Sequence, residues 1–103
     1  MSAKAFAEAV ALWQQGKARD AWRLCEELLA SAPRDFESLN IAGTIALQAG
    51  ETARADALLD EAIARDPSVA RTHCTRGMAQ HQLKQYDAAV ASFDRALALK
   101  PTL

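Results

Sequence analysis

Residues 70–103 read ARTHCTRGMAQHQLKQYDAAVASFDRALALKPTL and hold the clearest copy of a pattern that returns every 34 residues. The prolines of the chain all follow this period: Pro33, Pro67 and Pro101. Other residues in the same register are Gly16 with Gly50, Gly43 with Gly77, Ala21 with Ala55 and Ala89, and Cys25 with Leu59 and Phe93. A fixed period of roughly 20–50 residues is typical of repeat architectures. The sequence therefore predicts one domain over residues 1–103, made of three tandem units at about residues 2–35, 36–69 and 70–103.

Each unit carries the signals of two helices joined by a tight turn. Proline cannot continue a helix and disfavours helical backbone angles in the residue before it, so it ends the second helix of the unit. Gly16 and Gly50 lie mid-unit, where a reversing chain needs a left-handed residue. Lys84 takes that place in the third unit, at a cost of about 1 kcal/mol relative to glycine. The periodicity predicts helices at about residues 3–15, 18–31, 36–49, 52–65, 69–83 and 86–99.

The composition favours an all-α fold and argues against several function classes. Half of the residues are hydrophobic but only 6% are aromatic, and strong helix formers outnumber β-branched residues. A formal net charge of −1 argues against nucleic-acid binding, which needs a concentrated basic surface. The N-terminus lacks a signal-peptide core, and no apolar run is long enough for membrane insertion. The two cysteines lie inside predicted helices, which suits a cytoplasmic chain with reduced thiols.

The same register gives expectations about packing. Small residues at Gly43 and Gly77 should let neighbouring helices approach closely. The predicted N-caps are Asp35, Thr52 and Ser68. The predicted exposed ion pairs within helices are Arg23–Glu27 and Glu61–Arg65. The last helix carries an apolar stripe of Tyr86, Ala89, Val90, Phe93, Ala96 and Leu97.

This pattern resembles the tetratricopeptide repeat (TPR). The third unit is the best match, with Gly77, Tyr86, Ala89, Phe93, Ala96 and Pro101 at the small and large positions of the motif. The second unit keeps Leu39, Gly43, Gly50, Ala55, Leu59, Ala62 and Pro67. The first unit keeps Gly16, Ala21 and Pro33, but Ala9, Cys25 and Leu28 replace the more typical residues of the motif. The resemblance implies an α-solenoid, with six antiparallel helices in a right-handed superhelix.

The resemblance also implies a concave groove that is lined by the first helix of each unit and holds a peptide or a helix. The main groove residues would be Phe6, Val10, Trp13, Asn40, Thr44, Leu47, Arg71, Met78 and His81. Further groove positions would be Ala3, Glu37, Gln48, Cys74 and Gln82. The alternative interpretation of the first-unit end of the groove, with Ala3, Phe6, Val10 and Trp13, is burial against neighbouring helices.

Some members of the family hold the C-terminal carboxylate of chaperones in a clamp of Lys, Asn and Arg. In this sequence the first-unit clamp positions carry Phe6 and Val10, and the second-unit position carries Ile41 beside Asn40. The third-unit basic pair is reduced to Arg71, with Thr75 at the other place. We therefore expect no carboxylate clamp in this chain.

Catalytic and metal sites find little support in the sequence. No phosphate loop, zinc-protease motif or nucleophile elbow is present, so we expect no enzyme activity and no cofactor. Cys74, Met78 and His81 share one helical face, yet no second cluster completes a coordination shell, so a mixed groove lining is favoured over a metal site. Cys25 at a core position is read as a small hydrophobe, and His73 as a packing residue.

The predicted function is that of a protein-interaction module or scaffold that binds a protein or peptide partner. One alternative is self-association as a homodimer, through Val90 and Leu97 on the face of the last helix that a further helix would cover. Their first-unit counterparts, Trp22 and Leu29, would be buried. Another alternative is the N-terminal arm of a longer bacterial protein, such as a TPR-containing transferase, because the chain stops just after the repeat boundary at Pro101.

Overall fold

The computed structural model describes residues 6–31 and 34–101, and within these ranges it contains six helices and no strand. The helices are α2 (Ala7–Gln14), α3 (Ala18–Ser31), α4 (Phe36–Gln48), α5 (Thr52–Arg65), α6 (Ala70–Gln82) and α7 (Tyr86–Leu99). The six predicted helices are thereby confirmed, with ends that agree within one residue from α3 onwards. The first helix begins at Ala7, and residues 3–5 of its predicted range lie outside the described residues, as does Pro33.

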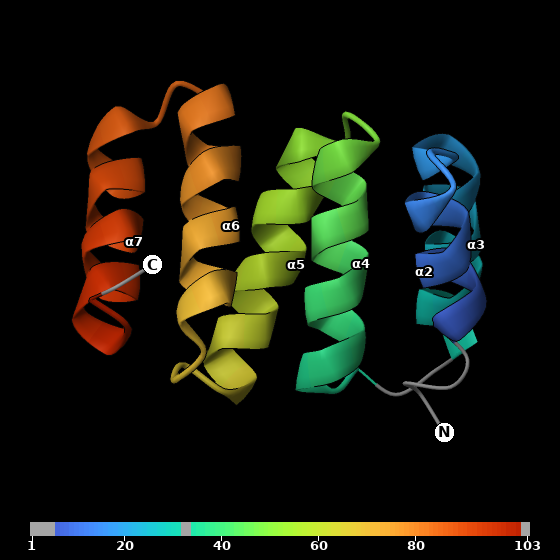
Figure 1. The fold of residues 1–103 in the computed structure, drawn as a ribbon, viewed down its shortest axis with the longest axis horizontal. Helices are drawn as coiled ribbons and strands as arrows, with labels where there is room; N and C mark the ends of the chain where they lie inside the picture. Colours follow the sequence, from blue (N-terminus) through green and yellow to red (C-terminus); the bar gives the residue numbers. More distant parts are fainter. Residues whose placement is uncertain (1–5, 32–33, 102–103) are drawn as a thin grey trace.

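The helices form three antiparallel pairs, α2–α3, α4–α5 and α6–α7, placed one after another along the longest axis of the molecule (Figure 1). Consecutive helices contact each other throughout, and α4 also contacts both α2 and α6. The predicted α-solenoid is therefore confirmed. No helix in the described ranges is both long and apolar enough to cross a membrane.

The turn inside each pair is the same motif three times. Gly16, Gly50 and Lys84 adopt the left-handed conformation, with φ angles of 81°, 85° and 63°. In the middle unit, the N–H of Gly50 donates to the carbonyl of Leu47, and that of the following residue to Ala46. These two bonds define a Schellman motif, which satisfies carbonyl groups left open at a helix end. The first and third turns repeat both bonds, so Lys84 carries out a glycine's role despite its side chain.

One of the three predicted N-caps is confirmed. The Asp35 carboxylate accepts a hydrogen bond of 2.8 Å from the Ser38 backbone N–H at the start of α4. Thr52 is instead the first residue of α5, and its hydroxyl donates across to Gln82 on α6. Ser68 was also wrong as a cap, because its N–H and hydroxyl both bond to Asp66 in a local turn.

Close packing between α4 and α5, and between α6 and α7, depends on glycine. A Cβ on Gly43 would lie 2.7 Å from Leu59 Cγ, and one on Gly77 would lie 2.7 Å from the Phe93 ring. Both distances are far below ordinary contact, so a side chain at either glycine would require the facing side chain or its helix to shift. The expectation for these two glycines is confirmed.

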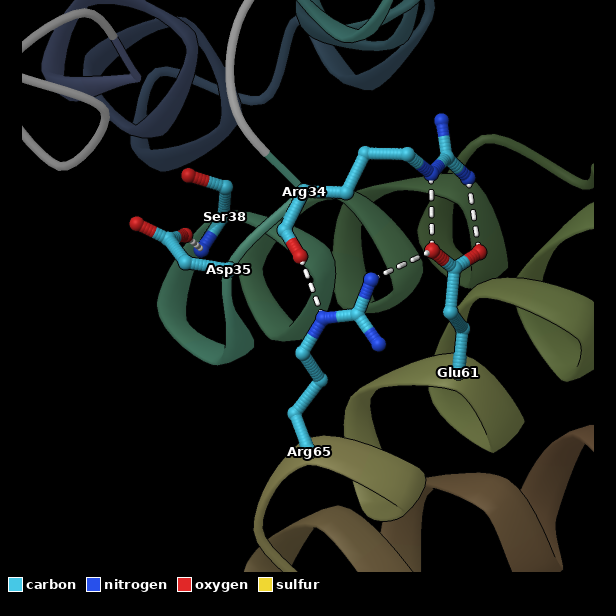
Figure 2. Close-up of polar contacts among 5 residues, drawn as sticks. All are labelled: Arg34, Asp35, Ser38, Glu61 and Arg65. Carbon is cyan, nitrogen blue, oxygen red and sulfur yellow. Dashed lines mark hydrogen bonds and ion pairs between the residues drawn. The ribbon is translucent and has the colours of Figure 1, made fainter.

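A charged cluster joins the second unit to the segment that precedes it (Figure 2). Arg34 donates from Nε and Nη2, on one edge of its guanidinium group, to the two oxygens of the Glu61 carboxylate on α5, at 2.7 and 2.8 Å. Arg65 donates to the Arg34 carbonyl at 2.6 Å and lies 3.5 Å from the same carboxylate. The predicted pair Glu61–Arg65 is confirmed, whereas Arg23 pairs with Asp20 rather than with Glu27. The hydrogen bond from Arg34 holds the pKa of Glu61 below its ordinary value.

Candidate functional site

The three helices predicted to line the groove are neighbours in the structure. α4 lies between α2 and α6 and contacts both. A side-chain hydrogen bond of 3.0 Å from the Thr72 hydroxyl to Asn40 Oδ1 ties α6 to α4. The candidate site is therefore a continuous surface rather than three separate helix faces.

The structure removes two residues from the predicted groove, one beside α2 and one on α4. Phe6 is fully buried in the hydrophobic core, and Leu47 is almost as well covered. Neither side chain offers a contact surface, because each packs against neighbouring helices. Val10 and Trp13 are half-buried, and Trp13 packs against the core. Ala3 lies outside the described residues.

The α4 part of the site is polar and already partly hydrogen-bonded. The Thr44 hydroxyl donates to the Asn40 backbone carbonyl at 2.8 Å, one turn earlier. Asn40 Oδ1 accepts from Thr72, so its amide nitrogen is the group left to donate to a ligand. Both side chains are half-buried, which leaves them accessible but restrained.

The α6 part is the most accessible. Arg71 and His81 are exposed, and Met78 keeps 43% of its surface in solvent. The His81 ring meets the Tyr86 ring edge-on, with 5.3 Å between centroids. Met78 and His81 line a depression of about 380 Å³ together with Phe93. Arg71, Met78 and His81 thus combine a positive charge with soft, apolar contact area.

The clamp positions provide no basic pair. Thr75 is half-buried, and its hydroxyl donates to the Arg71 carbonyl at 2.9 Å. Ile41 is half-buried and packs against the core. Arg71 is therefore the basic side chain among the matching positions.

The two cysteines differ in environment. Cys25 is fully buried, and burial raises the pKa of its thiol to about 12. Cys74 is half-buried on α6, and both thiols are free. Within the described ranges, no three side chains of His, Cys, Asp or Glu come together as a metal-binding group.

The predicted self-association edge is exposed. Val90 and Leu97 on α7 are 58% and 48% exposed. The residues at the same positions of the first helix pair, Trp22 and Leu29 on α3, are only 5% and 7% exposed. Helix α4 packs against α3, and no further helix among the described residues covers α7 in the same way.

Two features of the structure were not predicted from the sequence. Tyr86 was placed in the apolar stripe of α7, yet it is 53% exposed beside His81. A buried polar set also occupies α6 and α7, consisting of His73, Gln80 and Ser92 with the half-buried Arg76. Comparing the third unit with the second, position by position at the 34-residue spacing, could have found this set.

Comparisons with known proteins agree with the repeat architecture. The chain matches the tetratricopeptide repeat family over residues 6–70 and again over residues 42–103. No curated protein is similar enough to count as a match. Among solved structures, MamA is 19% identical with a TM-score of 0.83 over 90% of this chain, which spans 54% of the MamA chain.

Two further structures widen this comparison. The first TPR of Spaghetti (RPAP3), bound to the HSP90 peptide SRMEEVD, is 20% identical with a TM-score of 0.87, covering 99% of this chain and 82% of that one. A Thermobaculum terrenum O-GlcNAc transferase mutant is 29% identical with a TM-score of 0.83, covering 97% of this chain and 19% of that one. With family matches that together extend over all described residues, the chain belongs to the tetratricopeptide repeat family.

Proposed function

We propose that this chain is a non-catalytic protein-interaction module that binds a short segment of a partner protein along α4 and α6. The observation that carries the proposal is the exposure of Arg71, Met78 and His81 on α6, directly beside the polar face of α4. Exposed apolar side chains rimmed by polar ones are typical of interaction sites. The free thiols of Cys25 and Cys74 support a cytoplasmic location.

The chemistry of these side chains suits an extended or amphipathic peptide. The Asn40 amide can donate to a peptide carbonyl, and its orientation is fixed by the bond from Thr72. Met78 and His81 offer a soft apolar surface, since methionine adapts its shape to many partners. Arg71 adds a charge for an acidic residue of the ligand.

Peptide binding by structural relatives supports the class of ligand. The first TPR of Spaghetti (RPAP3) has been solved with the HSP90 peptide SRMEEVD. In this chain the positions that match a carboxylate clamp hold Phe6, Val10, Ile41 and Thr75, with Arg71 as the basic residue. We therefore propose recognition of an internal apolar or amphipathic segment, without dependence on a terminal carboxylate.

The test begins with peptides selected for binding from a displayed library of random short sequences. Met78→Ala and His81→Ala should each weaken the binding of a selected peptide by more than about 1 kcal/mol in the binding free energy, measured by calorimetry. The control is Leu99→Ala, which removes a side chain of similar exposure at the end of α7. Amidation of the peptide's C-terminus should leave the affinity unchanged. Equal effects of the three substitutions, or binding lost on amidation, would contradict the proposal.

A second candidate function is self-association through α7. It is favoured by the exposure of Val90 and Leu97, whose counterparts on α3 are covered by α4. An uncovered apolar strip on a chain of near-zero net charge promotes association. We expect light scattering to report a dimer that Val90→Lys and Leu97→Glu convert to a monomer, while Ala57→Glu on α5 leaves it intact. A wild-type chain that stays monomeric at high concentration would rule this candidate out.

A third candidate is an arm that positions partners or substrates for a larger protein. The support is the 29% identity to the Thermobaculum terrenum O-GlcNAc transferase mutant, of which this chain spans 19%. In such a protein the arm would bind and orient without taking part in the reaction. The length of the complete gene product tests this candidate, because a product that ends with residue 103 would exclude it.

A further inference from the structure

The third helix pair has a polar interior where the second pair has an apolar one. At the 34-residue spacing, Leu39, Ala42, Ala46 and Leu58 of the second pair correspond to His73, Arg76, Gln80 and Ser92 of the third. The four residues of the second pair are buried. Their counterparts His73, Gln80 and Ser92 are also more than nine-tenths buried, although burying polar groups costs free energy unless they are hydrogen-bonded.

Each of these polar side chains is held in place by a hydrogen bond. His73 Nε2 lies 2.8 Å from the Pro67 carbonyl, to which it donates. The Ser92 hydroxyl donates to Gln80 Oε1 at 2.6 Å, so the Gln80 amide nitrogen keeps its own hydrogens for another acceptor. Arg76 donates to Asp56 at 3.0 Å and lies 3.1 Å from Asp60, which orients its guanidinium group.

These groups border a cavity of about 340 Å³ between α5, α6 and α7. Ile63, Ala88 and Ala91 give it apolar walls, and Arg95 on α7 adds a second guanidinium. No Asp or Glu lines the cavity, and within the described ranges Arg95 makes no ion pair. Hydrogen-bond donors and an uncompensated positive charge thus meet apolar surface in one cavity.

The cavity is separate from the proposed groove. At 3.6 residues per turn, His73, Arg76 and Gln80 lie on the side of α6 roughly opposite to Arg71 and Met78. A ligand in the cavity would therefore leave the groove free. Its volume is at the lower end for small-molecule sites, which span about 300–1,000 Å³.

We propose that this cavity binds an organic carboxylate with a short apolar stem, supplied by a free small acid or by an acidic side chain. The planar fork of Arg95 matches the two carboxylate oxygens. The Gln80 amide nitrogen donates a further hydrogen bond, and Ala88, Ala91 and Ile63 contact the methylene groups. The pairing of Arg76 with Asp56 and Asp60 positions that side chain at the cavity and leaves Arg95 to neutralise the ligand.

Titration of the 15N-labelled chain with glutarate tests the proposal. We expect saturable shifts of the backbone amide signals of Ala88, Ala91 and Ser92, and no such shifts with glutaramide, which has the same shape without charge. A blocked glutamate, acetylated at its amino group and amidated at its carboxyl group, separates the two sources. Stronger binding of the blocked form points to a partner's side chain, and stronger binding of glutarate to a free acid.

Variants connect the shifts to the named residues. Arg95→Gln should weaken glutarate binding about tenfold or more, since a hydrogen bond between charged groups is lost. Ala91→Leu should abolish it by filling the cavity, while Arg23→Gln on α3 should change nothing. Absence of saturable shifts, equal shifts with glutaramide, tighter binding of inorganic phosphate, or full affinity in Arg95→Gln would each overturn the proposal.

Discussion

Leu59 on α5 packs against the backbone of Gly43 on α4 so closely that a methyl group on Gly43 would lie 2.7 Å from Leu59 Cγ. Leu59 is fully buried, whereas Phe93, which packs in the same way against Gly77, is half-buried. The side chains that face the two equivalent glycines therefore differ in how far they can move, Leu59 less than Phe93.

We predict that Gly43→Ala lowers the free energy of unfolding by about 1–2 kcal/mol, because overpacking outweighs the gain in helix propensity. Gly77→Ala should be nearly neutral, since the Phe93 ring can swing towards solvent and the helix gain offsets the strain. Urea unfolding of both variants measures the difference. Equal effects, or a Gly43→Ala variant as stable as the wild type, would show that the close contact is not a constraint.

Lys84 offers a stabilising substitution. Its φ angle of 63° is in the left-handed region, where a side chain is disfavoured and glycine is not. Lys84→Gly should raise the free energy of unfolding by about 0.5–1 kcal/mol. The reverse change, Gly50→Lys at the equivalent turn, should lower the free energy of unfolding by a similar amount. Thermal unfolding of the two variants tests whether one is stabilised and the other destabilised. A Lys84→Gly variant that melts below the wild type would contradict the turn assignment.

The ion pair between Arg34 and Glu61 gives a pH-dependent prediction (Figure 2). The pKa of Glu61 is lowered by the hydrogen bond from Arg34, so the stabilisation is complete above the ordinary glutamate pKa and is lost as the pH falls through the lowered value. Glu61→Gln should cost about 0.5–1 kcal/mol at neutral pH and nothing in strong acid. Glu27→Gln, at a side chain without an ion pair in the described ranges, is the control. A difference that persists unchanged into acid would exclude this ion pair as its cause.

The two thiols should react at very different rates. Cys25 is fully buried with a thiol pKa raised to about 12, and the thiolate is the form that attacks an alkylating reagent. In the Cys74→Ser variant, alkylation at mildly alkaline pH should therefore be slow and limited by opening of the structure. In the Cys25→Ser variant, the half-buried Cys74 should react much faster. Similar rates in the two variants would mean that the core around Cys25 opens readily.

The helices could be predicted because local signals decide them. Proline and glycine at fixed spacing, together with helical periodicity between them, placed helix ends to within one residue from α3 onwards. The N-caps were harder, because Thr52 and Ser68 each had a competing partner. Thr52 bonds to Gln82 on the next unit and Ser68 to Asp66, and only folded neighbours reveal that choice.

Exposure of individual groove residues could be predicted only in part. The resemblance assigns both Phe6 and Met78 to the groove, yet Phe6 is enclosed by the core while Met78 is 43% exposed. The difference depends on what packs beside each helix, which is not a local property. The polar interior of the third pair can be read from the sequence, because His73 occupies the position of Leu39 when the units are aligned. Periodicity alone, however, does not distinguish a buried core position from one that lines a cavity.

The most direct test of partner binding along α4 and α6 is amide chemical-shift mapping of the labelled chain with a selected, C-terminally amidated peptide. We predict that the largest changes fall on Asn40, Thr44, Arg71, Met78 and His81, and that Met78→Ala reduces them at equal peptide concentration. Largest changes on α3, on α5 or along the Val90–Leu97 edge of α7 would contradict binding in the groove.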